Sequence, residues 1–352
     1  MRMSDPRRDT LKWLRALAIS ACVALIALVA MPAVGEPVQS APHKYQPPRG
    51  PDGKPDFQGV WTNASITTLE RPARYKGLVI PPDQVKAATA THPQVVRQQT
   101  DDAADEGTQR LDGSDLARGR GYNAFWIDPG VEFGLVKGER RTSWIIDPLN
   151  GKIPYSAHGR EVVAHFEAQR DNFDGPEVRP PADRCLYTGG RIGPPMLNGL
   201  YNNNYQIVQT HDYVVILVEM VQHARVIPIE HSLADRHHIV ATLHPLFGDS
   251  IAWWDGDTLV VETTQFHPIQ LDSMVSVSPN ARVTERFTRV SNRQILYEFE
   301  VEDPSLYTQS WRGEMSLNSS NQRLYEYACH EGNYAMTGIL AGAREQEKRK
   351  AK

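Results

Sequence analysis

The sequence has few cysteines and none of the short motifs that identify common cofactor and catalytic sites. Its 352 residues include three cysteines, and neither a CxxC nor an HExxH motif occurs, so no compact zinc pattern is present. The absence of GxGxxG and Walker sequences argues against a nucleotide cofactor. A Gly-x-Ser-x-Gly nucleophile elbow is also missing, so an α/β serine hydrolase is not indicated.

An excess of basic charge is lacking as well. Residues 1–35 hold five basic and two acidic residues, so their removal would take the formal net charge from −4 to −7. A nucleic-acid interface needs a basic footprint. Small molecules are therefore the expected partners, and the sequence leaves the oligomeric state open.

The first 35 residues are expected to be a signal peptide. Basic residues precede an uncharged and mostly apolar stretch over residues 16–31, and small residues suit cleavage before Glu36. We expect export to the periplasm, with membrane attachment only through an uncleaved signal. Arg7 and Arg8 resemble a twin-arginine signal, but Thr10 stands where that pattern has a large apolar residue, so both export routes stay open.

Two cysteines, Cys185 and Cys329, remain after cleavage before Glu36. In an oxidising compartment they are predicted to form a disulfide, which would tie the middle of the chain to its end. Two separate buried thiols are the alternative.

The remaining chain divides by composition. Residues 36–56 are rich in Pro and Gly and predict an extended lead-in. Residues 57–340 are interpreted as a single β-rich domain, with a helical and loop excursion at about 82–120 and a short helix after Ser156. Residues 341–352 form a charged tail.

Short β-hairpins follow one another from residue 205 onward. The predicted pairs cover residues 205–221, 250–264, 282–301 and 311–329, each with a polar turn in its middle. Hairpins without intervening helices predict an all-β antiparallel meander. Closing the meander into a lipocalin-resembling barrel, or rolling it into a sandwich, would protect its edges. Long Pro- and Gly-rich loops and minor helices would decorate this body.

Two Glu/His pairs with the same spacing, Glu219/His223 and Glu326/His330, are the main candidates for chemistry. If both segments are strands, each pair lies on one face of its strand. Four residues along a strand cover roughly 13 Å, so a working dyad would need one member from each pair. We predict these four residues as catalytic acids, bases and their orienting groups. A structural ion-pair network is the alternative interpretation.

Five further side chains are predicted to bind substrate. Arg225 would hold an anion, while amide or hydroxyl groups of Asn203, Asn204, Tyr205 and Tyr327 would bind oxygen atoms. An ordinary loop with left-handed backbone conformations is the alternative explanation of the consecutive asparagines.

Three long phrases resemble a large group of exported bacterial proteins, most of them uncharacterised. The phrases are residues 201–210 (YNNNYQIVQT), 256–264 (GDTLVVETT) and 325–334 (YEYACHEGNY), within a resemblance over roughly residues 51–340. It implies an exported single-chain architecture and no particular reaction.

The leading functional hypothesis is a periplasmic, cofactor-independent acid/base enzyme, namely a lyase, decarboxylase or isomerase acting on a small organic substrate, with aromatic compounds among the candidates. A non-catalytic, lipocalin-like ligand-binding protein is the alternative, and a metal-dependent hydrolase is a further one. Because the histidine spacings match no compact pattern, no metal ligands are predicted.

Overall fold

The computed structural model describes residues 45–102, 129–186, 192–331 and 334–351. The predicted signal peptide and most of the second half of the 82–120 excursion lie outside these residues. A compact unit extends from Gln46 to Lys352. Its α-helices are α2 (Val85–Ala90), α3 (Pro93–Asp102), α5 (Ala157–Gln169) and α6 (Ala335–Lys350).

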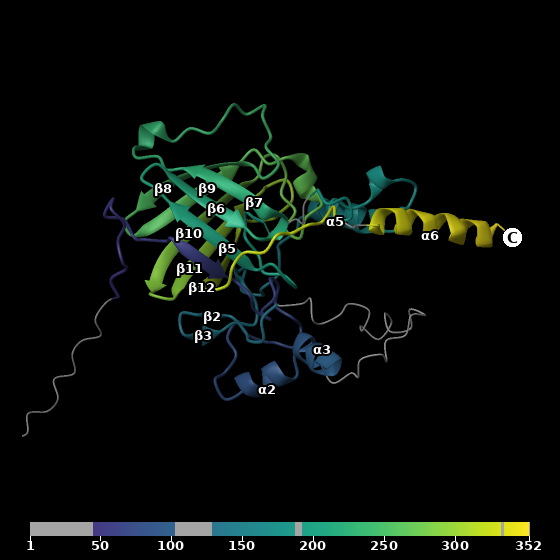
Figure 1. Ribbon diagram of the computed structural model, residues 1–352, viewed down its shortest axis with the longest axis horizontal. Helices are drawn as coiled ribbons and strands as arrows, with labels where there is room; N and C mark the ends of the chain where they lie inside the picture. Colours follow the sequence, from purple (N-terminus) through teal and green to yellow (C-terminus); the bar gives the residue numbers. More distant parts are fainter. Residues whose placement is uncertain (1–44, 103–128, 187–191, 332–333, 352) are drawn as a thin grey trace, which may run out of the picture. The chain divides into compact units, whose positions relative to one another are not determined.

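Antiparallel strands form one large sheet (Figure 1). In chain order they are β1 (Gly59–Thr62), β4 (Ile145–Asp147), β5 (Asn204–Gln209), β6 (Tyr213–Val218), β7 (His223–Pro228), β8 (Asp249–Asp255), β9 (Thr258–Thr264), β10 (Arg282–Ser291), β11 (Gln294–Glu302) and β12 (Trp311–Ser319). Their spatial order is β7-β6-β5-β1-β12-β11-β10-β9-β8, and β4 pairs with β12. The short strands β2 (Leu135–Val136) and β3 (Glu139–Arg140) form a separate hairpin.

The first and last strands of this order meet and nearly close a barrel. Just after β7, Ile229 forms a parallel bridge with Ala252 of β8, and the N–H of Glu230 donates to the carbonyl of Ala252 at 2.7 Å. We call this contact the seam. The all-β, barrel-like fold expected from the hairpin pattern is thereby confirmed.

Alternating side chains fill the barrel interior. Along β11, Ile295, Tyr297, Phe299 and Val301 are all buried, with their neighbours partly exposed. Phe299 packs so closely on Gly313 of the neighbouring strand that a Cβ there would lie 2.2 Å from its ring. Strand β11 therefore has one buried face and a repeat of two residues, as the sequence pattern predicted.

The outer face of β12 is also buried in part, at Glu314 and Ser316. Glu314, on that face, accepts from Nη2 of Arg141 at 2.6 Å and from Nζ of Lys137 at 2.5 Å. Both cations belong to the β2–β3 hairpin and the segment that follows it. The first half of the chain therefore covers β12 through charged contacts as well as through β4.

The prediction of one long strand over residues 213–221 is wrong. β6 ends at Val218, a short 3₁₀ turn covers Met220–Gln222, and β7 runs back with Val218 opposite His223. Val221 and Gln222 adopt positive φ values of 62° and 49°, which β-branched residues such as valine strongly disfavour. Glu219 and His223 therefore flank a reversal instead of sharing one face of a strand.

The expected strand over residues 323–329 is also wrong, because that segment has no regular secondary structure. Strand β12 is paired with β11 on one side, while its other side is paired with β4 at its start and with β1 at its end, where the predicted hairpin partner would begin. The predicted disulfide is confirmed, since Cys185 and Cys329 are bonded. It fastens the irregular segment to the middle of the chain.

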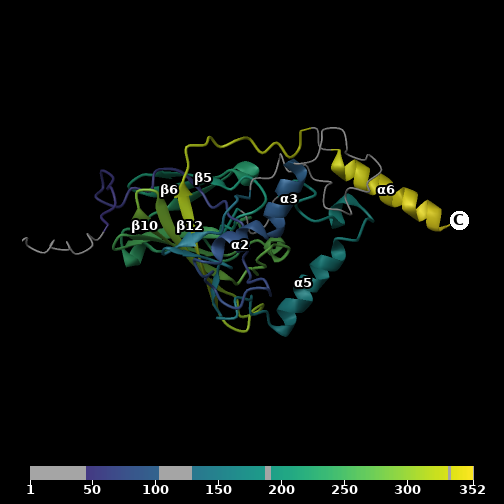
Figure 2. The same cartoon turned by 90° about the horizontal axis from the view of Figure 1, so that it is seen from below.

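Helices occur mainly where the sequence indicated them. The segment expected to make an excursion contains α2 and α3. Ser156 caps α5 by accepting from the N–H of Gly159. The helix α6, which was not predicted, includes most of the charged tail (Figure 2). Within the described ranges, no helix combines the length and the apolar character needed to cross a bilayer.

Candidate functional site

Glu219 is buried and both of its carboxylate oxygens are occupied. Oε2 accepts from the side-chain amide of Asn204 at 2.9 Å and from its backbone N–H at 3.2 Å. Oε1 accepts from the backbone N–H of Tyr325 at 3.0 Å. This carboxylate therefore joins the start of β5, the reversal after β6 and the C-terminal segment.

Arg225 is paired inside the barrel. Its guanidinium donates to both oxygens of Glu285 at 3.0 and 2.5 Å, and the Tyr297 hydroxyl donates to the same carboxylate at 2.7 Å. Burial acts to lower the pKa of Arg225, but the attraction of Glu285 outweighs it and raises the pKa. Burial and then Glu285 raise the pKa of Tyr297 well above its usual value. Arg225, with both carboxylate oxygens as partners, is thus a structural cation.

The other predicted binding residues lie in packed surroundings. The buried Asn203 side chain bonds the N–H and the carbonyl of Gly199 at 2.8 and 3.0 Å. The Tyr205 hydroxyl accepts from Nδ2 of Asn63 at 2.9 Å, and Tyr327 packs partly buried against the core. These contacts hold the entry to β5 and the C-terminal segment in place.

Of the predicted catalytic residues, His223 is half-buried beside an aromatic ring. Its ring lies 4.0 Å from that of Phe247. Burial, assisted by the charge of Arg225, lowers its pKa to about 4. Glu326 and His330, in contrast, are exposed.

The four predicted catalytic residues therefore do not share one enclosed pocket. Glu219 is buried in a saturated hydrogen-bond network, His223 packs against an aromatic ring, and the second pair faces solvent. The first pair also lost its common strand face, because the chain reverses between its members.

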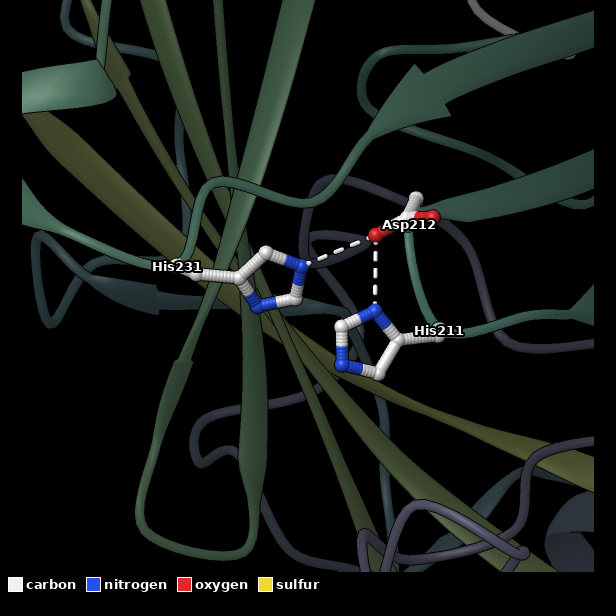
Figure 3. Close-up of side chains that lie close together, drawn as sticks. All are labelled: His211, Asp212 and His231. Carbon is white, nitrogen blue, oxygen red and sulfur yellow. Dashed lines mark hydrogen bonds and ion pairs between the residues drawn. The ribbon is translucent and has the colours of Figure 1, made fainter.

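A different cluster gathers two imidazoles and a carboxylate. In Figure 3, rings of His211 and His231 each present a nitrogen to the same oxygen of Asp212. The distances to Oδ1 are 2.7 Å from Nδ1 of His211 and 3.2 Å from Nε2 of His231. One ligand atom from each residue lies within 4.8 Å of the others. Because all three side chains are exposed, solvent and small molecules can reach them.

Strand register brings this cluster together. His211 and Asp212 form the turn between β5 and β6, where the N–H of Thr210 donates to the carbonyl of Tyr213 at 2.9 Å. Tyr213 at the start of β6 lies opposite Pro228 at the end of β7. The next backbone bond, from the N–H of Ile229 to the carbonyl of Asp212 at 2.7 Å, extends the ladder and brings His231 alongside the turn.

Electrostatics favour a charged carboxylate in the cluster. Hydrogen bonds from His211 and then from His231 lower the pKa of Asp212. The rings of the two histidines stack with centroids 4.4 Å apart. An anionic oxygen between two imidazoles is an arrangement that a cation can enter.

A cavity of about 350 Å³ adjoins His211. Gln209 builds it by clamping the lead-in to the end of β5: its Oε1 accepts from the N–H of Phe57 at 3.0 Å and its Nε2 donates to the carbonyl of Pro55 at 3.1 Å. The half-buried Asp52 and Asp56 lie in the cavity wall. The lining residues are Gly50, Pro51, Asp52, Asp56, Gln58, Gln209, Thr210 and His211.

Sequence reasoning missed this cluster because 19 positions separate Asp212 from His231. The usable signal was the register: once the reversal is placed between Val218 and His223, residues 212 and 229 fall opposite each other. Comparison of the chain with protein-family models, with curated proteins and with solved structures gave no match.

Proposed function

We propose that the protein is an exported metal-dependent hydrolase whose ion is held by His211, Asp212 and His231. The observation that carries the proposal is the presence of three ligand atoms within 4.8 Å next to a cavity of about 350 Å³. The disulfide supports export, because such bonds persist in oxidising compartments.

The donor set suits zinc. Catalytic zinc sites use three protein ligands, including pairs of histidines with one carboxylate, and leave a position open. Two ligands of one zinc ion lie at most about 4.4 Å apart, so the exposed rings need only small movements. Binding would also displace the ring protons that now point at Asp212, either to the other ring nitrogen or to solvent. When bound, zinc lowers the pKa of a coordinated water and polarises a carbonyl oxygen.

The cavity supplies the remaining groups. One oxygen of Asp52 accepts from the N–H of Lys54 at 3.1 Å, and one oxygen of Asp56 accepts from the N–H of Gln58 at 2.8 Å. These bonds fix the orientation of both carboxylates, and either can accept a proton from a water at the cavity mouth. Two carboxylates repel anionic substrates, so we propose neutral carboxylic esters as the substrate class.

The test combines metal content with turnover. Protein stripped with a chelator is supplied with one equivalent of zinc, desalted and measured for zinc and for hydrolysis of p-nitrophenyl acetate and p-nitrophenyl phosphate. We expect one zinc per chain and turnover of the acetate only. His211→Ala and His231→Ala should lose zinc and turnover together. Asp56→Asn should keep zinc, and comparing its turnover with that of Asp52→Asn shows which of the two carboxylates is the base.

The control is His237→Ala, since His237 is exposed on the same loop as His231 and lies outside the cluster. It should behave as wild type. Failure of the wild type to retain zinc would refute the metal site. Retained zinc without ester turnover would refute the hydrolase.

The acid/base lyase or isomerase expected from Glu219, His223, Glu326 and His330 receives less support. It needs four groups in one enclosed pocket, and two of them are exposed. Non-catalytic ligand binding in the barrel interior is likewise less favoured, because large core side chains occupy it.

A further inference from the structure

The outward side of strands β5, β6 and β7, which lie side by side in the sheet (Figure 1), is apolar. Buried and more exposed side chains alternate along each of these strands, so every second one points away from the barrel interior. Val208, Tyr213 and Val226 are among the outward side chains and are 40%, 48% and 61% exposed. We use the name apolar face for the surface made by Val208, Tyr213, Val215, Leu217, Val226 and Pro228.

Strand pairing arranges these side chains in rows. Tyr213 lies opposite Pro228 in the first row. Val215 lies opposite both Val208 and Val226 in the second row. Side chains that are directly opposite on one face of antiparallel strands have Cβ atoms roughly 5 Å apart. Each row is therefore a continuous apolar strip across the strands.

The outward side of another part of the same sheet is charged. Where β10 and β11 pair, Arg282 lies opposite Glu302 and Arg286 lies opposite Glu298 on the outward side. Of the residues in β5, β6 and β7, in contrast, only Arg225 carries a permanent charge, and its side chain is buried inside the barrel. The apolar face thus differs from an ordinary solvated sheet surface and has the character of a binding surface.

The size of the apolar face limits what can cover it. Three strands about 4.8 Å apart and five residues of about 3.3 Å each give an area of roughly 240 Å². A stable contact between two protein chains takes about 800 Å² from each partner, so the face is too small to hold a second copy by itself. A methylene group has about 30 Å² of accessible surface, so a single alkyl chain of about six carbon atoms fits on it.

The first row of the apolar face adjoins the metal cluster. Tyr213 follows Asp212 directly in the chain, and Pro228 lies three residues before His231. Because three residues along a strand cover about 10 Å, Val215 in the second row is about that far from Asp212. A chain of six carbon atoms that begins at the cluster therefore reaches both rows.

We propose that the apolar face binds the acyl chain of the ester substrate, so that the protein prefers esters of medium-chain carboxylic acids to acetates. This inference rests on the proposed hydrolase and narrows its substrate class. Tyr213 contacts the carbon atoms nearest to the carbonyl group, and the second row contacts those that follow. Since the side chains of the face are open to solvent, about half of the surface of the acyl chain is covered.

Chain length provides the first test, on protein loaded with zinc. p-Nitrophenyl hexanoate has four methylene groups more than p-nitrophenyl acetate. With about half of their surface covered, these four groups are equivalent to about two buried ones. We therefore expect kcat/KM to be about tenfold higher for the hexanoate than for the acetate.

Binding without metal provides the second test. 2-Octanone and 2-butanone also differ by four methylene groups, and neither is an ester that the protein could hydrolyse. In the presence of EDTA, the dissociation constant measured by ligand-observed NMR should be about tenfold lower for 2-octanone. This measurement depends neither on zinc nor on turnover.

Variants locate the chain. The double variant Val208→Thr with Val226→Thr keeps the β-branched shape of both side chains but replaces a methyl group of each with a hydroxyl, and should reduce both chain-length preferences to about threefold. Val226→Asp places a charge in the second row and should abolish both preferences. The matched controls are Val290→Thr and Val290→Asp, since Val290 is 38% exposed on β10 and lies outside the apolar face. Both controls should behave as wild type, and zinc content should be the same in all variants.

The outcomes separate the acyl site from the hydrolase. Equal kcat/KM for hexanoate and acetate, equal binding of the two ketones, or preferences that are unchanged in both the double threonine variant and Val226→Asp would overturn the acyl site and leave the hydrolase intact. Absence of zinc or of ester turnover would overturn the hydrolase. A ketone preference that Val226→Asp abolishes would in that case still support the apolar face as a site for an alkyl chain.

Discussion

The ion pair inside the barrel makes a sharp prediction about stability. Arg225 and Glu285 have side chains that are 3% and 0% exposed, and they come from β7 and β10. Removing one partner leaves the other charge buried without compensation, which typically costs about 3–5 kcal/mol. We therefore expect Arg225→Met and Glu285→Leu each to lower the free energy of unfolding by about that amount.

The double variant should be far less damaged than the two single variants together. With both charges gone, the main remaining cost comes from the hydroxyl of Tyr297, which loses its acceptor at Glu285. That loss should lower the free energy of unfolding by about 1–3 kcal/mol. The hydroxyl still accepts from the N–H of Met196 at 2.9 Å. The cycle should thus give a coupling free energy of several kcal/mol, on the order of 3 or more.

Urea unfolding at pH 7 of the oxidised protein measures these quantities through the midpoint and the slope m. The slopes should agree among the four proteins, so that the midpoints report stability. A double variant that loses the full sum of the two single losses would refute the reasoning, because the two side chains would then contribute independently.

Two further predictions concern pH and redox state. His223 has a pKa near 4 in the folded protein, below its ordinary value of about 6.5, so the stability it contributes is present above pH 6.5 and is lost as the pH falls toward 4. Between pH 7 and pH 4.5, wild type should therefore lose more unfolding free energy than His223→Gln, by on the order of 1 kcal/mol after solvent screening. Equal losses of the two proteins in urea unfolding would contradict the assignment. The disulfide joins residues 144 positions apart, so breaking it should lower the unfolding free energy by about 3–5 kcal/mol. Reduction and the double variant Cys185→Ser with Cys329→Ser should have this same effect. An unchanged thermal midpoint would show that the cross-link constrains the unfolded chain little.

Local signals were sufficient for most of the barrel. The hairpin around Gly256 was predictable, because Asp255 and Asp257 flank a glycine that adopts a φ of 60° between alternating strands. The reversal between Glu219 and His223 was not, because it contains neither glycine nor proline and places Val221 at a positive φ. Contacts from Asn204 and Tyr325, which are distant in the sequence, hold Glu219 there.

The candidate site was harder to predict than the fold. The tendency of Glu/His pairs to share a face depends on uninterrupted strands, and neither segment remains one strand. His211, Asp212 and His231 meet only because β6 and β7 pair with one particular register. A shift of that register by a single residue would separate the donors, and spacing along the chain carries no record of it.

The seam between β7 and β8 has one consequence for the motions of the barrel. Few backbone bonds cross it, while Arg225 on β7 reaches through the interior to Glu285 on β10, beyond the seam. Side chains thus brace the weakest backbone boundary from within. Amide protons along β7 and β8 should exchange with deuterium by local opening, and loss of the brace should speed their exchange before it affects strands such as β11.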